Sequence, residues 1–555
     1  MAQNTKDWDL YEAGKQYNNR LNPPYYETVN ANLDFFAGNQ WRNLPDSDMP
    51  KPVFNVIKRV IQFFVASLTS SKVQVHYEPL MLADNTPQME IDAANVANMQ
   101  ISTLFDKLKM EFKVRDALFD GAITGDYCAH FYFDPNKRPY NHAPGVMGEI
   151  CMELVDGTNV FFGNANNSNV EAQPYIIISG RDTVENLRAE AKRYRQGNEE
   201  EIQPDKEYEY QAGEAGEIEV EADEAGKALY IIVYRKVKKK VKKLDPLTME
   251  MVEEEVTTIK ASKSVRTAYI YKDIDTGLSR YPIAWGNWEK QKNQYHGRAV
   301  ATGLLPNQIF INRMFAMVMY HLMMTAFPKA VYNANVIDLW SNAIGEAIPV
   351  HGVGPETNLK NIAAYLEPAN MSNQIVQVIE MVMQYTKEMM GVSDASLGQV
   401  DPKNTSAIIA VQKSTTIPLE NPKANLYEWV EDIGHILFDM MGTYYGLRPI
   451  VREINGQKIT ELFDFSIFKD MWLDVKADVG ESSYWSQIAA NQTLDNLLTA
   501  GHIDIIQYLE RVPDEYIPQK QELIADIQVR MQAQMQANLL TQQALQQGTQ
   551  PLPVG

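Results

Sequence analysis

The sequence predicts an α+β fold that is divided into several domains. Segments with apolar residues at helical spacing, such as 305–326 and 374–390, occur in the same chain as segments that alternate apolar and charged residues, such as 229–243 and 252–271. Of the 555 residues, 45% are hydrophobic and 22% are charged. A chain of this composition can bury a large core, and its length exceeds that of one compact domain.

Charge and cysteine content limit the class of protein. The 51 Lys and Arg residues are outnumbered by 71 Asp and Glu residues, and the net charge of −20 argues against a protein that grips nucleic acid with its whole surface. Only Cys128 and Cys151 are present, and the chain does not open on a basic, hydrophobic signal segment. We therefore expect synthesis in a reducing cytoplasm. We expect no membrane span in the apolar stretch 309–327, because Asn312 and Arg313 are costly in hydrocarbon.

The first 180 residues are predicted to mix helices and strands. A helix ends at Gly38 within residues 34–41, and its glycine is followed by Trp41. Apolar residues at helical spacing predict a helix at 53–68, and alternation predicts a strand at 73–77. The pattern then continues in this order: a long helix at 89–123 ending near Gly121 and Gly125, strands at 128–133, 150–162 and 175–179, and a helix from Asp182 or Thr183.

A charged region follows. Residues 196–227 are rich in Glu, Asp, Gly and Gln, which is typical of a solvated surface excursion. Residues 229–243 and 252–271 predict a β-hairpin that turns at 245–248. Its basic run could contact DNA or an acidic neighbour, but Glu253 to Glu255 opposite it favour a charged antiparallel ribbon. The run consists of Arg235, Lys236, Lys238, Lys239, Lys240, Lys242 and Lys243.

Two long helices are predicted to flank a small module. A strand at 281–285 leads into a helix at 305–326, with Pro306 in its first turn, and a second helix at 374–390 ends at Gly391. The module between them, residues 328–371, is predicted to contain a strand at 330–332, a helix at 336–344 and a strand at 347–350. A module held at the tip of two helices is exposed, and such a position favours docking.

The rest of the chain is predicted from breaks and turns. Residues 391–406 form a polar loop too long for a tight turn, which is typical of functional or mobile loops. A helical region at 407–445 is broken at Pro418 and Pro422. The remaining elements are strands within 448–476 that turn at Asn455-Gly456, and helices at 483–500, 503–510 and 518–540.

Patterns of known catalytic and metal sites are missing from the sequence. No Gly-rich phosphate loop ends in Gly-Lys-Ser/Thr, and residues 273–277 resemble a calcium loop whose closing Glu is replaced by Ala284. No zinc spacing and no Gly-x-Ser-x-Gly elbow occur, and Cys128 with His130 is weak evidence for a thiol nucleophile. We therefore expect no enzyme, no cofactor and no metal, and interpret the histidines as structural: His76, His130, His296, His321 and His435.

The order of these elements resembles that of the portal proteins of tailed bacteriophages. The resemblance covers most of the chain and is most specific at residues 36–41 with the helix at 55–67, and at 391–406 with the helix that follows. The family fold then implies these segments: a wing at 1–285 with a charged excursion at 196–270, a stem helix at 286–327, a clip at 328–372, a second stem helix at 373–390, a tunnel loop at 391–406, a tunnel helix and wing return at 407–480, and a crown with a Gln-rich tail at 481–555.

The resemblance also implies a function. The chain would form a homo-dodecameric ring at one vertex of the viral capsid, assembled in the host cytoplasm, and double-stranded DNA would pass through it during packaging and ejection. Its partners would be the terminase large subunit, a head–tail adaptor, and the major capsid or scaffolding protein. A negative lumen would let DNA slide.

Two groups of site residues follow from the resemblance. The DNA-facing tunnel loop would present Ser396, Gln399, Lys403, Asn404 and Ser406. The docking surface of the clip would present Trp340, Glu346, His351, Glu356 and Lys360. Lys403 would touch the DNA backbone, although an exposed lysine in a surface loop needs no special role.

Two other functions remain open at this point. The chain could be a minor capsid or head–tail adaptor protein that forms no channel, although such adaptors are usually shorter and lack the helix, tip and helix arrangement. It could also be a nucleic-acid-processing enzyme with an unrecognised site, which would bind or cleave DNA in isolation. A portal would do neither strongly.

Overall fold

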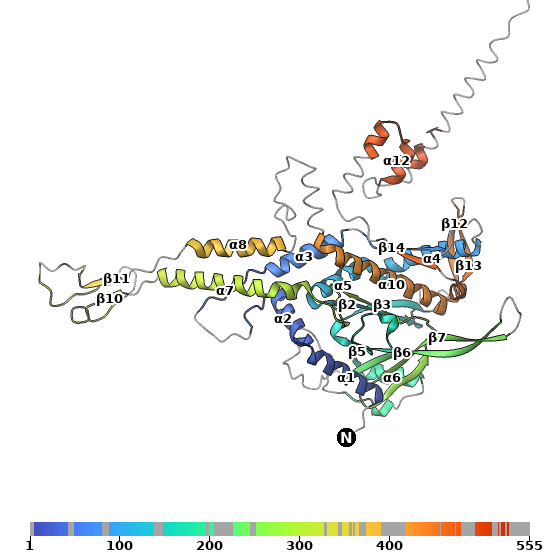
Figure 1. Ribbon diagram of the computed structural model, residues 1–555, viewed down its shortest axis with the longest axis horizontal. Helices are drawn as coiled ribbons and strands as arrows, with labels where there is room; N and C mark the ends of the chain where they lie inside the picture. Colours follow the sequence, from blue (N-terminus) through green and yellow to red (C-terminus); the bar gives the residue numbers. More distant parts are fainter. Residues whose placement is uncertain are drawn as a thin grey trace, which may run out of the picture. The chain divides into compact units, whose positions relative to one another are not determined.

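The computed structural model confirms the α+β class, with long helices packed on antiparallel sheets (Figure 1). The chain divides into two compact units, residues 1–480 and 481–555. The structure describes residues 5–531 except for the following: 43–48, 71, 80–87, 138–147, 195–198, 205–225, 245–250, 327–329, 342–346, 355–357, 359–360, 366–372, 390–416, 455–456, 472, 479–493, 513–519, 521–522 and 528–529.

The N-terminal segment contains the two helices and the strand that the sequence predicts, and one further helix before them. Helix α2 (Tyr25–Ala37) ends at Gly38, which adopts the left-handed conformation (φ 101°) that glycine accommodates without steric cost. Helix α1 (Lys6–Arg20) precedes it, and α3 (Val56–Leu68) and strand β1 (Gln74–Pro79) follow. Helix α3 begins three residues later than predicted, since Asn55 caps it by accepting a hydrogen bond from the Lys58 amide.

The single helix predicted at 89–123 is two helices. Helix α4 (Gln88–Leu108) ends before Lys109, which has φ 54°, and α5 (Met110–Thr124) begins after it. Both helices contribute to the buried core, so packing on the core fixes a break that no glycine or proline marks. The predicted end is confirmed, because Gly125 caps α5 with φ 102°.

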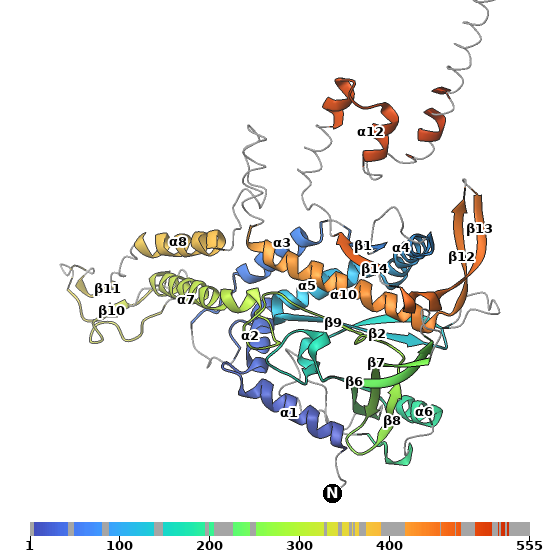
Figure 2. The ribbon, with the colours of Figure 1, turned by 45° about the vertical axis from the view of Figure 1, so that its right-hand side comes forward.

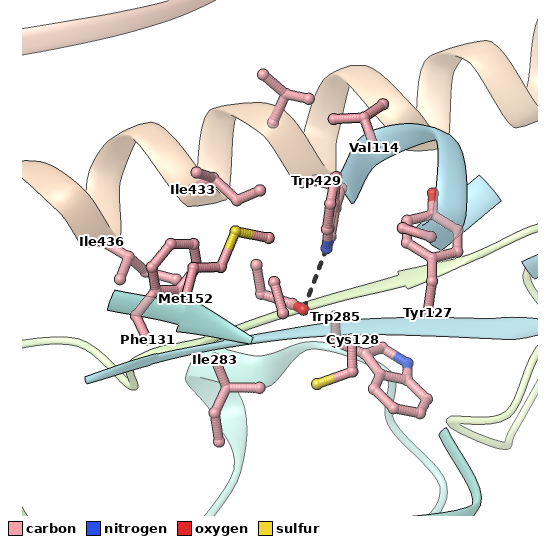
Figure 3. Close-up of a cluster of buried hydrophobic side chains, with 14 of the residues drawn as sticks. Val114, Tyr127, Cys128, Phe131, Met152, Ile283, Trp285, Trp429, Ile433 and Ile436 are labelled. Atoms are coloured by element: carbon pink, nitrogen blue, oxygen red, sulfur yellow. Dashed lines mark hydrogen bonds between the residues drawn. The ribbon is translucent and has the colours of Figure 1, made fainter. Parts of the chain in front are cut away.

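A three-stranded antiparallel sheet in the order β3-β2-β9 lies beneath helix α10 (Glu420–Tyr444). Its strands are β3 (Glu149–Val155), β2 (Asp126–Asp134) and β9 (Ile283–Asn287). Figure 3 shows the apolar layer between helix and sheet, where the indole Nε1 of Trp429 donates to the carbonyl of Ala284 at 3.1 Å. Trp429 is fully buried and meets Tyr127 edge to face.

A second, five-stranded sheet has the order β4-β5-β6-β7-β8 and a helix on each face. Alternate residues of β6 pack on α1, including Leu229, Ile231 and Val233, whereas Ala228 packs with helix α6 (Val184–Tyr194). The strands are β4 (Val160–Phe162), β5 (Tyr175–Thr183), β6 (Lys227–Leu244), β7 (Met251–Ser264) and β8 (Tyr269–Asp275).

The hairpin of β6 and β7 is confirmed as a charged ribbon. Its register places Lys240 opposite Glu255, and the Lys238 ammonium lies 3.7 Å from the Glu255 carboxylate. The Lys239 ammonium lies 3.3 Å from the Asp275 carboxylate on β8. Lysines of the basic run are therefore balanced by carboxylates of the same sheet. Most of the acidic excursion at 196–227 lies outside the described residues.

Helices α7 (Val300–Ala326) and α8 (Asn373–Met389) are the predicted long pair and lie side by side in both views (Figures 1 and 2). Helix α7 starts five residues earlier than predicted, so Pro306 lies inside the helix and not in its first turn. The N-terminal half of α7 packs on α2, α3 and α5. This packing compensates for the one backbone hydrogen bond that proline cannot donate.

The small module between α7 and α8 differs from the prediction. Strand β10 (Ala330–Tyr332) is confirmed, but it pairs with β11 (Ala363–Tyr365), and 347–350 is not a strand. The described part of 336–344 is not helical, because the chain turns after β10 and the Val336 carbonyl accepts from the His351 amide. Short polar stretches with Asn, Asp and Ser favour such turns over a helix.

The C-terminal part of the first unit returns to the sheets. A 3-10 turn (Ile417–Leu419) leads into α10, where Pro422 lies in the first turn and therefore starts the helix instead of breaking it. Strands β12 (Leu447–Ile454) and β13 (Gln457–Asp464) form a hairpin, and β14 (Leu473–Asp478) pairs with β1. The predicted turn at Asn455-Gly456 lies outside the described residues.

The second unit contains helix α12 (Ile505–Arg511). Asp504 caps it in a capping box with Gln507, and the Tyr508 hydroxyl donates to Asp495 at 2.6 Å. The helix predicted at 503–510 is thus confirmed. Helical residues 494–499 and 523–527 fall within the other two predicted segments, whose remaining parts are largely undescribed.

Candidate functional site

Helices α7 and α8 expose an unusual amount of apolar surface. Side chains on the second half of α7 are exposed over much of its circumference, and α8 adds more. The exposed residues are Met317, Met319, Tyr320, Leu322, Met323 and Met324 on α7, and Val376, Val378, Met381 and Tyr385 on α8. By length and mean hydropathy α7 could also cross a membrane. Large exposed apolar surface marks a place where another molecule binds.

Helix α8 has three distinct sides. Ile379 and Thr386 are buried, and they face α7, the helix on which α8 packs. Gln377, Glu380 and Gln384 are exposed on the opposite side, at helical spacing. Val378, Met381 and Tyr385 form an apolar flank between these two sides. A helix with an apolar flank and one polar side fits an assembly in which the polar side faces water.

A chain of buried amides holds the base of α7 to the N-terminal segment. The Asn312 amide donates to Gln40 Oε1 at 2.5 Å, and Gln308 Nε2 donates to Asn312 Oδ1 at 2.9 Å and to the Phe54 carbonyl at 2.7 Å. Gln308 Oε1 accepts from the Val56 amide. Gln308 and Asn312 are almost fully buried. Buried polar groups with all partners present fix one arrangement of the elements that carry them.

A second buried polar cluster lies just before α7 and is centred on Asp126. One carboxylate oxygen accepts from Asn287 Nδ2 and from the Gly297 amide, each at 2.7 Å. The other accepts from Tyr25 at 2.8 Å and lies 2.6 Å from His296 Nδ1. Burial and the Asp126 charge raise the pKa of Tyr25 well above its ordinary value, so its hydroxyl remains a donor.

Each of these partners belongs to a different part of the fold. Tyr25 starts α2, Asp126 starts β2, Asn287 ends β9, and His296 and Gly297 precede α7. The Asp126 cluster therefore fixes where α7 leaves the body. The interpretation of His296 and His130 as structural is supported, since His130 is likewise buried between Glu153 and Tyr234 at 2.8 Å each.

Two of the five predicted docking residues of the module can be placed. The Trp340 ring stacks on Tyr332 and meets Tyr365 edge to face, with centroids 5.5 and 5.8 Å apart. The exposed His351 ring lies 3.9 Å from the Asp338 carboxylate. Glu346, Glu356 and Lys360 lie outside the described residues, as does the whole loop 391–406 with Ser396, Gln399, Lys403, Asn404 and Ser406.

Two cavities of about 180 and 310 Å³ share Arg280 in their walls and border α10. Burial and the Arg280 charge lower the pKa of His435 in the first cavity to about 4. Burial and the Glu428 carboxylate raise the pKa of Asp432 in the second to about 6. Among the described residues no group of three His, Cys, Asp or Glu side chains could hold a metal ion.

The raised pKa of Asp432 predicts a pH-dependent gain of stability in Asp432→Asn. The Asp432 carboxyl binds its proton more tightly in the folded protein than in the unfolded chain. Ionisation of this carboxyl therefore lowers the free energy of unfolding as the pH rises from about 4 to about 6. At pH 7.5 we expect the free energy of unfolding of the variant to exceed that of the native protein by about 1 kcal/mol, after allowing for solvent screening of a half-buried group. At pH 3.5 urea titrations of the two proteins should coincide, and an equal gain at both pH values would contradict this assignment.

Sequence reasoning missed most of the residues that hold the base of α7. The sequence does not identify Gln40, Asp126 and Gln308 as contacts, although residues 36–41 and Asn55 belong to its most characteristic stretch. The sequence signal that could have revealed these buried contacts is a side-chain amide at a position where the helical pattern requires an apolar residue, as at Gln308 and Asn312. Partners more than 250 residues away cannot be read from such a pattern.

A family model described as "Phage P22-like portal protein" matches residues 21–552. A search of curated proteins found no matching protein.

Proposed function

The chain belongs to the phage P22-like portal protein family, whose model covers nearly its whole length, and from this membership we propose how its helices and module build the portal. As a phage portal protein it is a structural component of the virion, and it assembles as an oligomeric ring through which double-stranded DNA passes. The predicted family and function are thereby confirmed.

We propose a ring of twelve copies in which α8 lines the DNA channel. The observation that carries this proposal is the three-sided surface of α8: one side packs on α7, the flank of Val378, Met381 and Tyr385 is apolar, and the third side is polar. In a ring the polar side is the one that remains in water, so Gln377, Glu380 and Gln384 face the lumen. Neutral amides and a carboxylate offer no attraction to phosphates, so DNA can slide.

The remaining segments take the roles that the family fold implies. Residues 1–285 and 407–480 form the wing, 328–372 the clip, 391–406 the tunnel loop, and 481–555 the crown. The clip docks on the terminase large subunit during packaging and on a head–tail adaptor afterwards, and scaffolding or major capsid protein contacts the body. The tunnel loop presents Lys403 and its polar neighbours to DNA.

The proposed role is mechanical and involves no chemical reaction. The ring holds no cofactor, needs no membrane and catalyses no reaction, and the ATP-driven motor is a partner. Assembly takes place in the host cytoplasm. The chain of buried amides around Gln308 and the Asp126 cluster anchor α7 rigidly. This anchoring supports the role, because a channel must keep its shape while DNA moves through it.

The lumen assignment predicts that Glu380→Lys converts a sliding surface into a binding one. Each ring would gain one inward-facing ammonium per subunit and lose one carboxylate, and we expect the affinity for short duplex DNA at 50 mM salt to rise at least tenfold with a steep salt dependence. Fluorescence anisotropy with labelled duplex measures this change. The matched control is Glu185→Lys on α6, which alters the net charge equally away from the lumen. Equal increases in both variants would contradict the assignment.

A further inference from the structure

We infer that the smaller cavity beside α10, of about 180 Å³, is a binding site for a small inorganic oxyanion of the phosphate and sulfate class. Three elements form its polar wall: the segment between β8 and β9 with Arg280, helix α10 with His435 and Asp439, and a 3-10 helix (Phe465–Asp470) with Lys469. The cavity lies within one copy of the chain, so the site does not depend on the proposed ring.

Two cations of this cavity are not used by the part of the protein that the structure describes. The Arg280 side chain is half-buried, and no described residue forms a hydrogen bond or an ion pair with its guanidinium. The exposed Lys469 ammonium likewise has no such contact with any described residue. A guanidinium presents five donors in a planar fork that matches the oxygens of phosphate and sulfate. The cavity therefore offers donors that an anion can occupy.

The carboxylate in the wall of the cavity is already engaged by the backbone. Asp439 Oδ2 accepts from the amides of Ser279 and Arg280 at 2.8 and 3.1 Å. The other charged side chains among the described residues that line the cavity are Arg280 and Lys469. Two cations thus face one carboxylate, and a bound anion relieves the repulsion between them.

His435 responds to this uncompensated positive charge. Burial and the Arg280 charge lower the pKa of His435 to about 4, although the Asp474 carboxylate acts in the opposite direction. The ring is therefore neutral near neutral pH and can donate one hydrogen bond and accept another. An anion beside the ring stabilises the imidazolium, so binding of the anion raises the pKa of His435.

The cavity is preformed and suits a small ligand. The Phe438 ring stacks on Phe468 with centroids 4.6 Å apart, and Gly442 allows the 3-10 helix to approach α10 closely. A Cβ at Gly442 would lie only 3.2 Å from Phe468 Cβ and 3.4 Å from Lys469 Cγ. The volume of about 180 Å³ is below the roughly 300–1,000 Å³ of pockets for larger ligands, which favours an inorganic anion over a nucleotide.

The test is calorimetric titration of the full-length chain with sodium sulfate at constant ionic strength and about pH 6, where sulfate carries no exchangeable proton. We expect saturable binding that Arg280→Gln and Lys469→Gln each weaken by about tenfold, the loss typical of one charge-assisted hydrogen bond. Lys469 is exposed, so its variant folds even if Arg280→Gln does not. The matched control is Lys423→Gln, which removes a cation from α10 outside the cavity and should change the affinity by less than about twofold.

A second readout follows the proton of His435. In buffers of different ionisation enthalpy, the native protein should take up protons as sulfate binds, and His435→Gln should take up clearly fewer. Inorganic phosphate should displace sulfate, whereas a short DNA duplex should not.

Four results would overturn the site. The first is the absence of saturable binding up to about 10 mM sulfate. The second is native affinity in both Arg280→Gln and Lys469→Gln, or an equal loss in Lys423→Gln. The third is unchanged proton uptake in His435→Gln, which would place the anion away from this ring. The fourth is displacement of sulfate by duplex DNA, which would contradict a site for a free inorganic anion.

Discussion

Asp126→Ala is expected to lower the free energy of unfolding by about 3–5 kcal/mol, the range for removing one partner from a buried charged cluster. Asp126 is fully buried and accepts hydrogen bonds from Tyr25, Asn287 and the Gly297 amide, with His296 beside it. The alanine would leave these groups without their acceptor in the interior, which costs far more than the loss of one exposed contact.

Urea unfolding followed by tryptophan fluorescence measures this change. Hydrogen exchange in the first turns of α7 should also accelerate, because the Asp126 cluster holds the segment from which α7 starts. Asp9→Ala on the exposed side of α1 is the matched control and should change stability by less than about 0.5 kcal/mol. A loss below about 1 kcal/mol in Asp126→Ala would show that the cluster does not hold the elements together.

Trp429→Ala is the second substitution with a large expected effect, again about 3–5 kcal/mol. The indole fills the layer between α10 and the three-stranded sheet, meets Tyr127 at 5.3 Å between ring centroids, and donates to the Ala284 carbonyl (Figure 3). Alanine removes the packing, leaves a cavity and orphans the carbonyl of a buried strand.

Trp429→Phe separates the two contributions. Phenylalanine retains most of the apolar contact and loses the hydrogen bond, so we expect a smaller loss of about 1–2 kcal/mol. Thermal and urea unfolding of the two variants measure the difference. Equal losses in both would mean that the hydrogen bond, and not the packing of the indole, dominates this contact.

Elements with a clear local pattern of apolar residues could be predicted from the sequence, and elements fixed by tertiary packing could not. Helices α3, α7 and α8 and the β6–β7 hairpin were predicted because each buries one side at its characteristic period. The break at Lys109 was missed because lysine is a good helix former and only packing places it at φ 54°. The module was predicted wrongly after β10, since short polar segments follow tertiary contacts more than propensity.

The site was predictable in outline but not in its contacts. The order of helix, module and helix indicated the family, and the family model confirms it. Gln308 and Asn312 anchor α7 by donating to the Phe54 carbonyl and to Gln40 Oε1, and these partners are brought together by the fold and not by sequence neighbourhood. The predictions for residues 391–406 and for Glu346, Glu356 and Lys360 concern positions outside the described residues and stay predictions.

Electron microscopy of the purified full-length chain, combined with native mass measurement, tests the central claim most directly. The account predicts closed rings of twelve copies with an open channel that admits duplex DNA, and rings of thirteen would still support the portal ring. A chain that remains a monomer or dimer at every salt concentration tested would contradict the ring and the lining of its lumen by α8.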